Sequence, residues 1–362
     1  MNKYALLIAS ILVIASGSIQ PTWAGWEIIN LHPAGASYSY ANGVSGGQQV
    51  GDVYLEGLWP PCAGLWSGDS GGWVNLNPPA ATYSEACGVS GGQQVGSAIV
   101  GGYPHASLWG GTPQSWVDLN PVGASQSWAY DLSSSRQVGV AQVGGAWHAG
   151  LWNDTAESWV DLDPGGASES YAFGIWGDWQ AGWVAYGDYP HASLWNGTAD
   201  SLVDLNPAGA SRSEARDVFG SQQVGFADIG GEHASLWSGT AESWVDLNPA
   251  GASESQAYGI SGGWQVGTVT LGDHWHASLW NGTPGSWVDL HALLPAGYLH
   301  SGAIAIDTSE TDIWIAGYAH NSSLERNEAM LWHYVVPEPS SMLAMLGSLL
   351  ALSSAAVRRR LR

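Results

Sequence analysis

The strongest constraint on the fold of this chain is an internal repeat that occurs seven times. A Leu-Trp pair recurs in steps of 42 or 43 residues, and a seventh copy ends at Trp332. Two further markers, Trp-Val-Asp-Leu-Asn-Pro and Gln-Val-Gly, also reach seven copies when degenerate versions are included. Self-similarity at a period of ~20–50 residues is the signature of a repeat architecture. The six regularly spaced tryptophans of the Leu-Trp pairs are Trp66, Trp109, Trp152, Trp195, Trp237 and Trp280.

Each repeat contains four short apolar segments separated by clusters of Gly, Pro, Asn and Ser. This spacing predicts strands joined by tight turns, and Asn196-Gly197 directly follows a Leu-Trp pair, as a hairpin turn requires. Four strands in a unit of ~40–45 residues are typical of a propeller blade. The sequence therefore predicts an all-β fold, a single seven-bladed β-propeller over residues 25–335. An open β-solenoid is the alternative architecture.

The order of the strands also predicts how the ring closes. Trp26 opens the kind of strand that follows Leu-Trp in other repeats, whereas the last repeat stops at Trp332. If that strand is the outermost of a blade, residues 26–31 complete the blade formed by the segments around Ile304, Trp314 and Leu331. Such closure would remove the open sheet edges that invite aggregation.

Both ends of the chain carry targeting features. Lys3 precedes an apolar run, and small residues follow up to Ala24, which predicts a secretory signal peptide over residues 1–24, with an uncleaved anchor as the alternative. At the other end, the apolar residues 342–357 precede a basic cluster. This stretch is slightly short for a membrane span of ~17–25 residues, and a plain C-terminal anchor is one interpretation of it. The remaining features of residues 336–362 are Val336, Pro337, Glu338 and Pro339 before the apolar stretch and Arg358, Arg359 and Arg360 after it.

The order Val-Pro-Glu-Pro, apolar segment, Arg cluster resembles the PEP-CTERM sorting signal of Gram-negative bacteria. The resemblance implies export, transient anchoring in the inner membrane by a transmembrane helix, and processing by an exosortase-type enzyme. It also implies association with exopolysaccharide. The seven repeats resemble the HAF family of extracellular repeats, which implies a secreted β-rich protein of the cell surface without an established catalytic activity. In this chain the family's His-Ala-Phe is written His-Ala-Ser, at His105, His191, His233 and His276.

The charge balance excludes nucleic acid as a partner. Residues 25–336 carry four basic residues against thirty acidic ones, a formal net charge of −26. A polyanion needs many cationic contacts, which this segment does not offer.

A histidine recurs in five repeats and invites comparison with a metal site. Each histidine belongs to a different repeat, so the five cannot converge on one zinc ion. We predict instead that each hydrogen-bonds to the recurring aspartate of an adjacent strand. Calcium needs six to eight oxygen ligands, and only one carboxylate recurs per repeat, so calcium binding stays open without a location, and no other cofactor is predicted. The pairs to test join His105, His148, His191, His233 and His276 with Asp118, Asp161, Asp204, Asp246 and Asp289.

Cys62 occupies the histidine position of its repeat, and Cys87 occupies a tyrosine position in the next one. Export favours oxidation, so a disulfide between them is one prediction, and two buried free thiols are the alternative.

Tryptophans outside the repeat pattern are the candidate ligand-binding residues. Trp179, Trp264 and Trp314 share the position before Gln-Val-Gly, where other repeats have Gln or Arg, and this tolerance predicts an exposed site. Trp147 and Trp275 share the position before the recurring histidine. Exposed aromatic faces beside polar groups suit sugar rings, although these side chains could simply cover hydrophobic edges.

These observations favour an exported, non-enzymatic propeller that serves as a structural or interaction module of the cell surface or an exopolysaccharide matrix, with matrix proteins as partners. A lectin-like, carbohydrate-binding propeller is the alternative, and a polysaccharide-active enzyme is less favoured because no pair of carboxylates stands out. The longer last repeat, residues 293–327, is the best place for a hidden site. Its candidate groups are His300, Asp307, Glu310 and Asp312.

Overall fold

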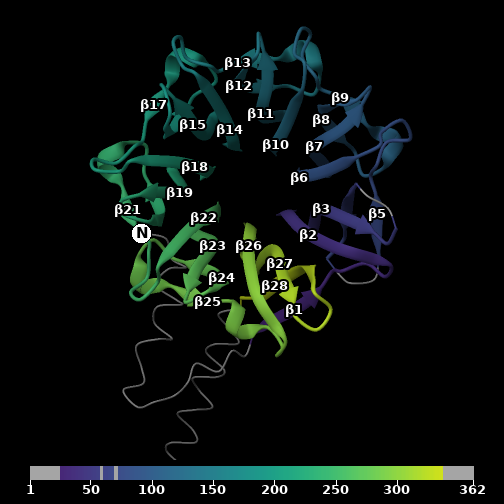
Figure 1. Ribbon diagram of the computed structural model, residues 1–362, viewed down its shortest axis with the longest axis vertical. Coiled ribbons are helices and arrows are strands. Elements are labelled where there is room, and N and C mark those ends of the chain that lie inside the picture. The colour runs from purple at the N-terminus through teal and green to yellow at the C-terminus, as the bar shows by residue number, and fades with distance from the viewer. Residues whose placement is uncertain (1–24, 58–59, 69–71, 337–362) are drawn as a thin grey trace, which may run out of the picture.

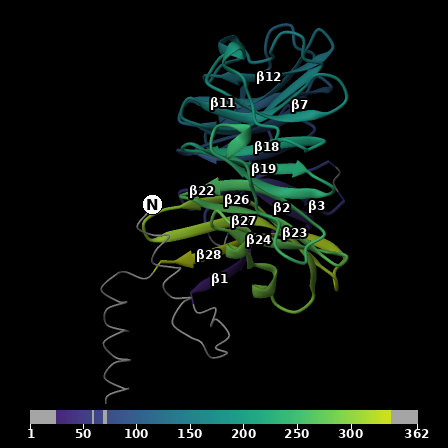
Figure 2. The same cartoon turned by 90° about the vertical axis from the view of Figure 1, so that its left-hand side faces the viewer.

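The computed structural model describes residues 25–57, 60–68 and 72–336, and these form seven four-stranded antiparallel sheets arranged in a ring (Figure 1). The predicted seven-bladed β-propeller is confirmed. Seen from the side, the strands run roughly along the axis of the ring (Figure 2). No helix within the described ranges is long and apolar enough to cross a bilayer. The predicted signal peptide and the sorting-signal residues Pro337, Glu338, Pro339, Arg358, Arg359 and Arg360 lie outside these ranges.

The blades follow one another along the chain, and each runs from its innermost to its outermost strand. Blade 1 contains β2 (Ala36–Ser45), β3 (Gln48–Leu55), β4 (Cys62–Trp66) and β5 (Trp73–Asn75). Blade 2 contains β6 (Ser84–Ser90), β7 (Gln93–Val100), β8 (Tyr103–Trp109) and β9 (Val117–Asp118). Blade 3 contains β10 (Ser127–Ser133), β11 (Arg136–Val143), β12 (Ala146–Trp152) and β13 (Val160–Asp161). Blade 4 contains β14 (Glu169–Trp176), β15 (Trp179–Ala185), β16 (Pro190–Trp195) and β17 (Val203–Asp204).

The remaining blades repeat this plan. Blade 5 contains β18 (Arg212–Phe219), β19 (Gln222–Asp228), β20 (Glu232–Trp237) and β21 (Val245–Asp246). Blade 6 contains β22 (Glu254–Ser261), β23 (Trp264–Leu271), β24 (His274–Trp280) and β25 (Val288–Asp289). Blade 7 contains β26 (Tyr298–Thr308), β27 (Asp312–Asn321), β28 (Arg326–Val335) and β1 (Trp26–Asn30). Short 3-10 turns are η1 (Pro113–Ser115), η2 (Ala156–Ser158), η3 (Ala199–Ser201), η4 (Ala241–Ser243), η5 (Pro284–Ser286) and η6 (His291–Leu293).

The first strand of the chain closes the ring, as predicted. β1 is the outermost strand of blade 7 and pairs antiparallel with β28, from Trp26 opposite Tyr334 to Asn30 opposite Met330 (Figure 1). The pairing continues one residue further, because the Leu31 N–H donates to the Ala329 carbonyl at 2.9 Å.

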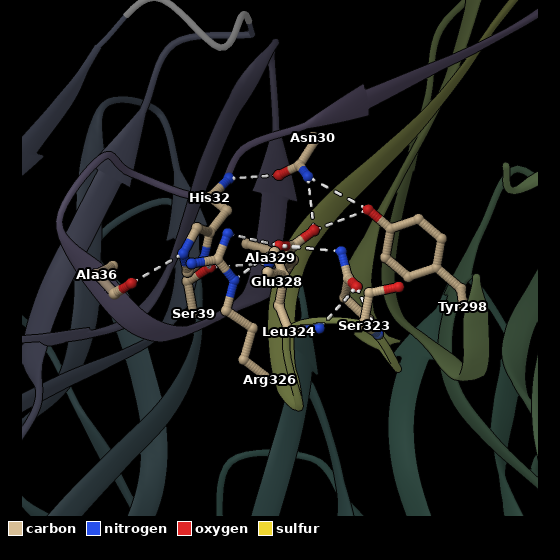
Figure 3. Close-up of polar contacts among 11 residues, drawn as sticks. Asn30, His32, Ala36, Ser39, Tyr298, Ser323, Leu324, Arg326, Glu328 and Ala329 are labelled. Atoms are coloured by element: carbon tan, nitrogen blue, oxygen red, sulfur yellow. Dashed lines mark hydrogen bonds and ion pairs between the residues drawn. The ribbon is translucent and has the colours of Figure 1, made fainter. Parts of the chain in front are cut away.

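A polar network around Glu328 reinforces this closure (Figure 3). Glu328 is 2% exposed, and its carboxylate accepts hydrogen bonds from Asn30 Nδ2 at 2.8 Å and from the Tyr298 hydroxyl at 2.7 Å. Arg326 donates to the other carboxylate oxygen at 2.8 Å. Burial disfavours ionisation of Glu328, but these hydrogen bonds and the Arg326 charge outweigh it and lower the pKa of the carboxyl.

The core consists of apolar clusters between neighbouring blades. The tryptophans of all seven Leu-Trp pairs are at most 2% exposed. Trp152 of blade 3, for example, packs with Val95 and Leu108 of blade 2 in one cluster. The Trp of each Leu-Trp pair therefore packs on the preceding blade, whereas the Leu, as at Leu151, packs on the following one.

The glycine of Gln-Val-Gly is required by close backbone contact inside each blade. At Gly182 a Cβ atom would lie 1.9 Å from the Tyr171 carbonyl oxygen of the adjacent strand. The six equivalent glycines meet the same obstacle at 1.8–2.0 Å. Backbone cannot move aside as a flexible side chain can, so no other residue fits at this position.

We expect Gly182→Ala to destabilise the protein by about 3 kcal/mol, because the new methyl group overlaps a backbone carbonyl. Gly165→Ala is the matched control, since a Cβ there meets nothing within 4 Å and the φ angle is not positive. Chemical denaturation of both variants would measure the effect. Equal stability of the two would contradict the steric explanation.

A buried serine links each pair of neighbouring blades by hydrogen bonds. Ser213, at the start of blade 5, accepts the Ala192 N–H of blade 4 at 2.9 Å and donates to Asn206 Oδ1 at 2.6 Å. The equivalent serines are Ser39, Ser84, Ser127, Ser170, Ser255 and Ser301, and each accepts the backbone N–H of an alanine in the preceding blade. The serine and asparagine that recur in the repeat thus form one structural unit, which we call the serine bridge.

We expect Ser213→Ala to lower the free energy of unfolding by roughly 1–3 kcal/mol, because it leaves a buried N–H and a buried amide oxygen without partners. Ser211→Ala is the control, since the exposed Ser211 hydroxyl makes only a long contact of 3.4 Å to the Asp228 carbonyl. Thermal unfolding of the two variants compares them. A Ser213→Ala protein as stable as the control would show that the bridge is dispensable.

Candidate functional site

A β-bulge interrupts the innermost strand of every blade. In β18, for example, Ala215 pairs with Gly225 and Asp217 with Val224, so Arg216 between them has no partner in the ladder. An extra residue of this kind is left unpaired and redirects the strand. The seven bulged residues are Asn42, Cys87, Tyr130, Phe173, Arg216, Tyr258 and Ile304.

All seven bulged residues line one cavity at the centre of the ring, with a volume of about 290 Å³. We call it the central cavity. Every blade contributes one side chain from the same position of its first strand. The repeated backbone therefore sets the shape of the central cavity, and the seven bulged side chains determine which groups face it.

The residue after the bulge allows the inner strands to approach one another. Four blades have glycine there, and a Cβ at Gly174 would lie 2.7 Å from the Asp217 Cα of the next blade. Blades 3 and 5 have Asp131 and Asp217 instead. Asp131 accepts the Ile175 N–H at 2.9 Å and Asp217 accepts the Ile260 N–H at 2.8 Å, so each aspartate holds the first strand of the next blade.

Both aspartates are held in an environment that disfavours their charge. Burial raises the pKa of Asp131 to about 6 and raises the pKa of Asp217 well above its ordinary value. The nearby Asp131 carboxylate adds to the shift of Asp217. The wall of the central cavity therefore contains carboxyl groups that give up their protons reluctantly.

Arg216 is the only basic residue among the described residues that line the central cavity. Its Nη2 lies 2.7 Å from Glu214 Oε2, and its guanidinium group lies over the rings of Phe173 at 5.3 Å and Tyr258 at 5.9 Å. Its Nε is buried and has no hydrogen-bond partner within the described residues. Glu214 and the two rings thus hold the guanidinium in place where it lines the central cavity.

A carboxylate pair stands behind the opposite wall, next to Asn42. Asn42 Nδ2 donates to Asp52 Oδ2 at 3.1 Å. Burial, together with the nearby Glu85 carboxylate, raises the pKa of Asp52 to about 7. Glu85 in turn accepts the Ser97 hydroxyl at 2.9 Å.

A chain of aromatic rings leads outward from the central cavity. Tyr130 and Phe173 line the cavity with ring centroids 5.2 Å apart, and Phe173 lies 6.0 Å from Tyr171. Tyr171 stacks on Trp183 at 4.5 Å and lies 6.1 Å from Trp147. This row of aromatic rings, the aromatic chain, extends over the side of the ring of blades on which the innermost strands begin.

The predicted ligand-binding tryptophans do not form one site. Trp179, Trp264 and Trp314 lie beside the turns between first and second strands, and each is partly buried against a different interblade cluster. Trp314 also stacks on His333, with ring centroids 3.4 Å apart. The prediction that this shared position is exposed is wrong, because each ring lies on the neighbouring blade.

Trp147 and Trp275 lie on the opposite side of the ring, beside the turns between second and third strands. Trp147 packs on Trp128 at 5.4 Å within the aromatic chain. Trp275 is 53% exposed and lines a separate cavity between blades 5, 6 and 7. Only Trp275 of the five therefore offers a largely free ring.

The predicted histidine–aspartate pairs are confirmed. In five blades the histidine Nδ1 lies 2.8–2.9 Å from the aspartate Oδ2 of the adjacent outer strand. The side chains are partly exposed, so each pair contributes at most about 1 kcal/mol. Within the described ranges, no group of three or more His, Cys, Asp or Glu side chains is arranged to hold a metal ion.

The cysteines do not form a disulfide. Cys62 lies in the third strand of blade 1, whereas Cys87 is the bulged residue of blade 2, and both thiols are free. Burial raises the pKa of each thiol.

The candidate groups of the long last repeat are spread over both ends of blade 7. Asp307 accepts the Gly46 N–H at 2.7 Å and Asp312 contacts His333 at 2.7 Å, both beside the turn between β26 and β27. His300 stands near the other end of β26, next to Trp275. These groups do not converge on a hidden site.

The bulged residues, above all Arg216, were not predicted from the sequence. A signal was present in the sequence. The position two residues before the Ile, Val or Leu near the end of each first strand varies strongly between repeats, from Asn to Cys, Tyr, Phe, Arg and Ile. Variation at one position of a regular repeat marks a side chain that the scaffold does not need.

No family model and no curated protein matches the chain. Solved structures share its fold. Prolyl endopeptidases match with a TM-score of 0.53 and 12% identity over 84% of this chain and 51% of theirs. Puromycin hydrolase matches with a TM-score of 0.56 and 10% identity over 82% of this chain and 55% of its own. The propeller domain of the Trilobed protease from Pyrococcus furiosus, which has an open velcro topology, matches with a TM-score of 0.56 and 10% identity over 84% of this chain and 97% of that domain.

These comparisons correct the predicted function. The neighbours are propellers of hydrolytic enzymes, among them peptidases, so the expectation of a surface or exopolysaccharide-matrix module, with sugar binding as its alternative, is contradicted. The chain spans about half the length of the whole peptidases that it matches. At 10–12% identity the likeness shows the fold alone.

The raised pKa of Asp131 predicts a pH-dependent stability. The pKa of this carboxyl is about 6 in the folded protein against 3.8 ordinarily, so the folded state holds the proton more tightly. Its ionisation therefore opposes folding as the pH rises from 3.8 to about 6, and the loss persists above that window.

We expect Asp131→Asn to be more stable than the natural protein by about 1–3 kcal/mol near pH ~8, with the difference shrinking toward pH ~4. The amide cannot ionise but keeps an oxygen for the Ile175 N–H. Urea unfolding across this pH range measures the effect, and the exposed Asp200→Asn is the control. A pH-independent difference would rule out the assigned charge.

Proposed function

We propose that this chain is a peptidase-related propeller that binds a peptide end in its central cavity and does not itself cleave the peptide. The observation that carries the proposal is the ring of seven bulged residues around a single cation, Arg216. A cavity of about 290 Å³ is near the lower limit of ~300–1,000 Å³ for ligand pockets, which suits a chain end rather than a folded partner. The likeness to peptidase propellers supports a peptide as the ligand.

The chemistry of the cavity supports recognition of a terminal carboxylate. Arg216 lies above aromatic faces and lines the cavity, so its guanidinium charge attracts an anionic oxygen there. The rings of Tyr130 and Phe173 offer apolar contact for the adjoining residue.

The nucleophilic groups in and around the cavity do not favour cleavage of a bound peptide. Cys87 faces the cavity, but burial raises the pKa of its thiol, which disfavours a nucleophilic thiolate. Two His–Ser hydrogen bonds occur in the described residues, His32 with Ser39 at 2.7 Å and His291 with Ser301 at 2.8 Å. Both serines are completely buried in serine bridges, so a substrate cannot reach them.

The test compares tetra-alanine with its C-terminal amide in calorimetric titrations. We expect the natural protein to bind the free acid at least tenfold more tightly, because a hydrogen bond to a charged group contributes about 1.5–3 kcal/mol. Arg216→Ala should abolish this preference. Arg136→Ala is the control, because it also removes an ion pair, to Asp178 at 2.6 Å, beside the turn between β10 and β11 and away from the residues that line the cavity. Equal binding of the acid by the natural protein and Arg216→Ala would refute the proposal.

A further inference from the structure

A second cavity of about 310 Å³ opens beside the central cavity, between blades 5, 6 and 7. We call it the side pocket. Tyr258 lines both cavities and forms the wall between them. Its hydroxyl donates to Gln256 at 2.8 Å, which holds the ring in place. Its lining includes Glu232, Glu254, Tyr258, Thr270, Trp275 and Tyr318.

Strand register places an acid and an aromatic ring in one row across the floor of the side pocket. Glu254 of β22 pairs with Thr270 of β23, and Thr270 pairs with Trp275 of β24. Directly paired residues point to the same face of a sheet, so Glu254 and Trp275 flank Thr270 on one face. This row stands at the end of the blade where Trp275 is 53% exposed.

The two carboxylates of the side pocket differ in what they already bind. Glu232 is engaged by the Arg212 guanidinium and by the Gln256 amide. Glu254 is exposed, and its carboxylate makes no hydrogen bond or ion pair with any described residue. Glu254 is therefore the charge that remains for a ligand.

Aromatic rings complete a site for a cation. Trp275, Tyr258 and Tyr318 line the side pocket from three strands of blades 6 and 7. A cation is attracted to the face of Trp or Tyr, and a guanidinium can also stack on a ring while it binds a carboxylate. The net charge of −26 over residues 25–336 further favours cationic ligands.

We propose that the side pocket binds the basic side chain of an arginine or lysine in a peptide whose end lies in the central cavity. The proposal rests on the function proposed above and adds its specificity. Glu254 pairs with the cationic group, and Trp275 and Tyr258 cover its faces. Because Tyr258 separates the two cavities, the backbone stays in the central cavity while one side chain passes beside this ring.

The test uses two tetrapeptides that differ only in arginine against citrulline, its neutral isostere, measured by calorimetry. The natural protein should bind the arginine peptide at least fivefold more tightly. Glu254→Gln should remove this preference and leave binding of the citrulline peptide unchanged. Glu157→Gln is the control, since it removes an equally exposed carboxylate from η2 on another blade.

Agmatine, a free guanidinium compound, separates failure of the side pocket from failure of the proposed function. If agmatine binds and Glu254→Gln or Trp275→Ala weakens it at least fivefold, the cation site stands even when neither peptide binds, and the central cavity is then not a peptide site. If agmatine does not bind, if both substitutions leave its binding unaffected, or if both peptides bind and the arginine peptide is not preferred, the side-pocket proposal is overturned.

Discussion

The serine bridge is the contact on which the ring depends. At each junction one buried hydroxyl accepts a backbone N–H from the preceding blade and bonds to a polar side chain after that blade's last strand. Ser213 does so with Ala192 and Asn206, and Ser39 does so with Ala329 and His32. A buried polar group without its partner is costly, so the bridge fixes the distance and angle between blades. Seven equal junctions close a ring, and the central cavity is the space that this geometry leaves.

Much of the fold follows from the sequence because its determinants recur. Alternation of side chains along a strand placed each histidine toward the aspartate of the next strand, and the strand order placed Trp26 in the last blade. The bulges were not predicted, because one extra residue in a short strand cannot be recognised from the alternation of apolar and polar residues along it. Arg216 was therefore not predicted, although it stands at a position that differs freely between repeats.

For the tryptophans, the variety of residues found at one repeat position was wrongly taken to mean that the position is exposed to solvent. The position of Trp179 accepts Gln, Arg or Trp, which suggested a surface site. In the structure, Gln, Arg and Trp at this position have in common that they are long enough to contact the next blade, and not that they are exposed. Arg136 bonds to Asp178 of the next blade, Gln93 lies 3.5 Å from Asp154 of the next blade, and Trp179 packs on the cluster between blades 4 and 5. A long side chain at this position extends over the neighbouring blade, whatever its polarity.

Pairing of β1 with β28 also has a consequence for the order of folding. Six blades are each built from strands that are consecutive in the chain, so each can form from local hairpins. Blade 7 alone joins the start of the described chain to its end, across the longest sequence separation in the fold. Contacts of this kind form slowly because a long loop must first be closed. We therefore expect ring closure to be the last step of folding, with blades 1 and 7 presenting unpaired surfaces to any chaperone or neighbouring chain until then.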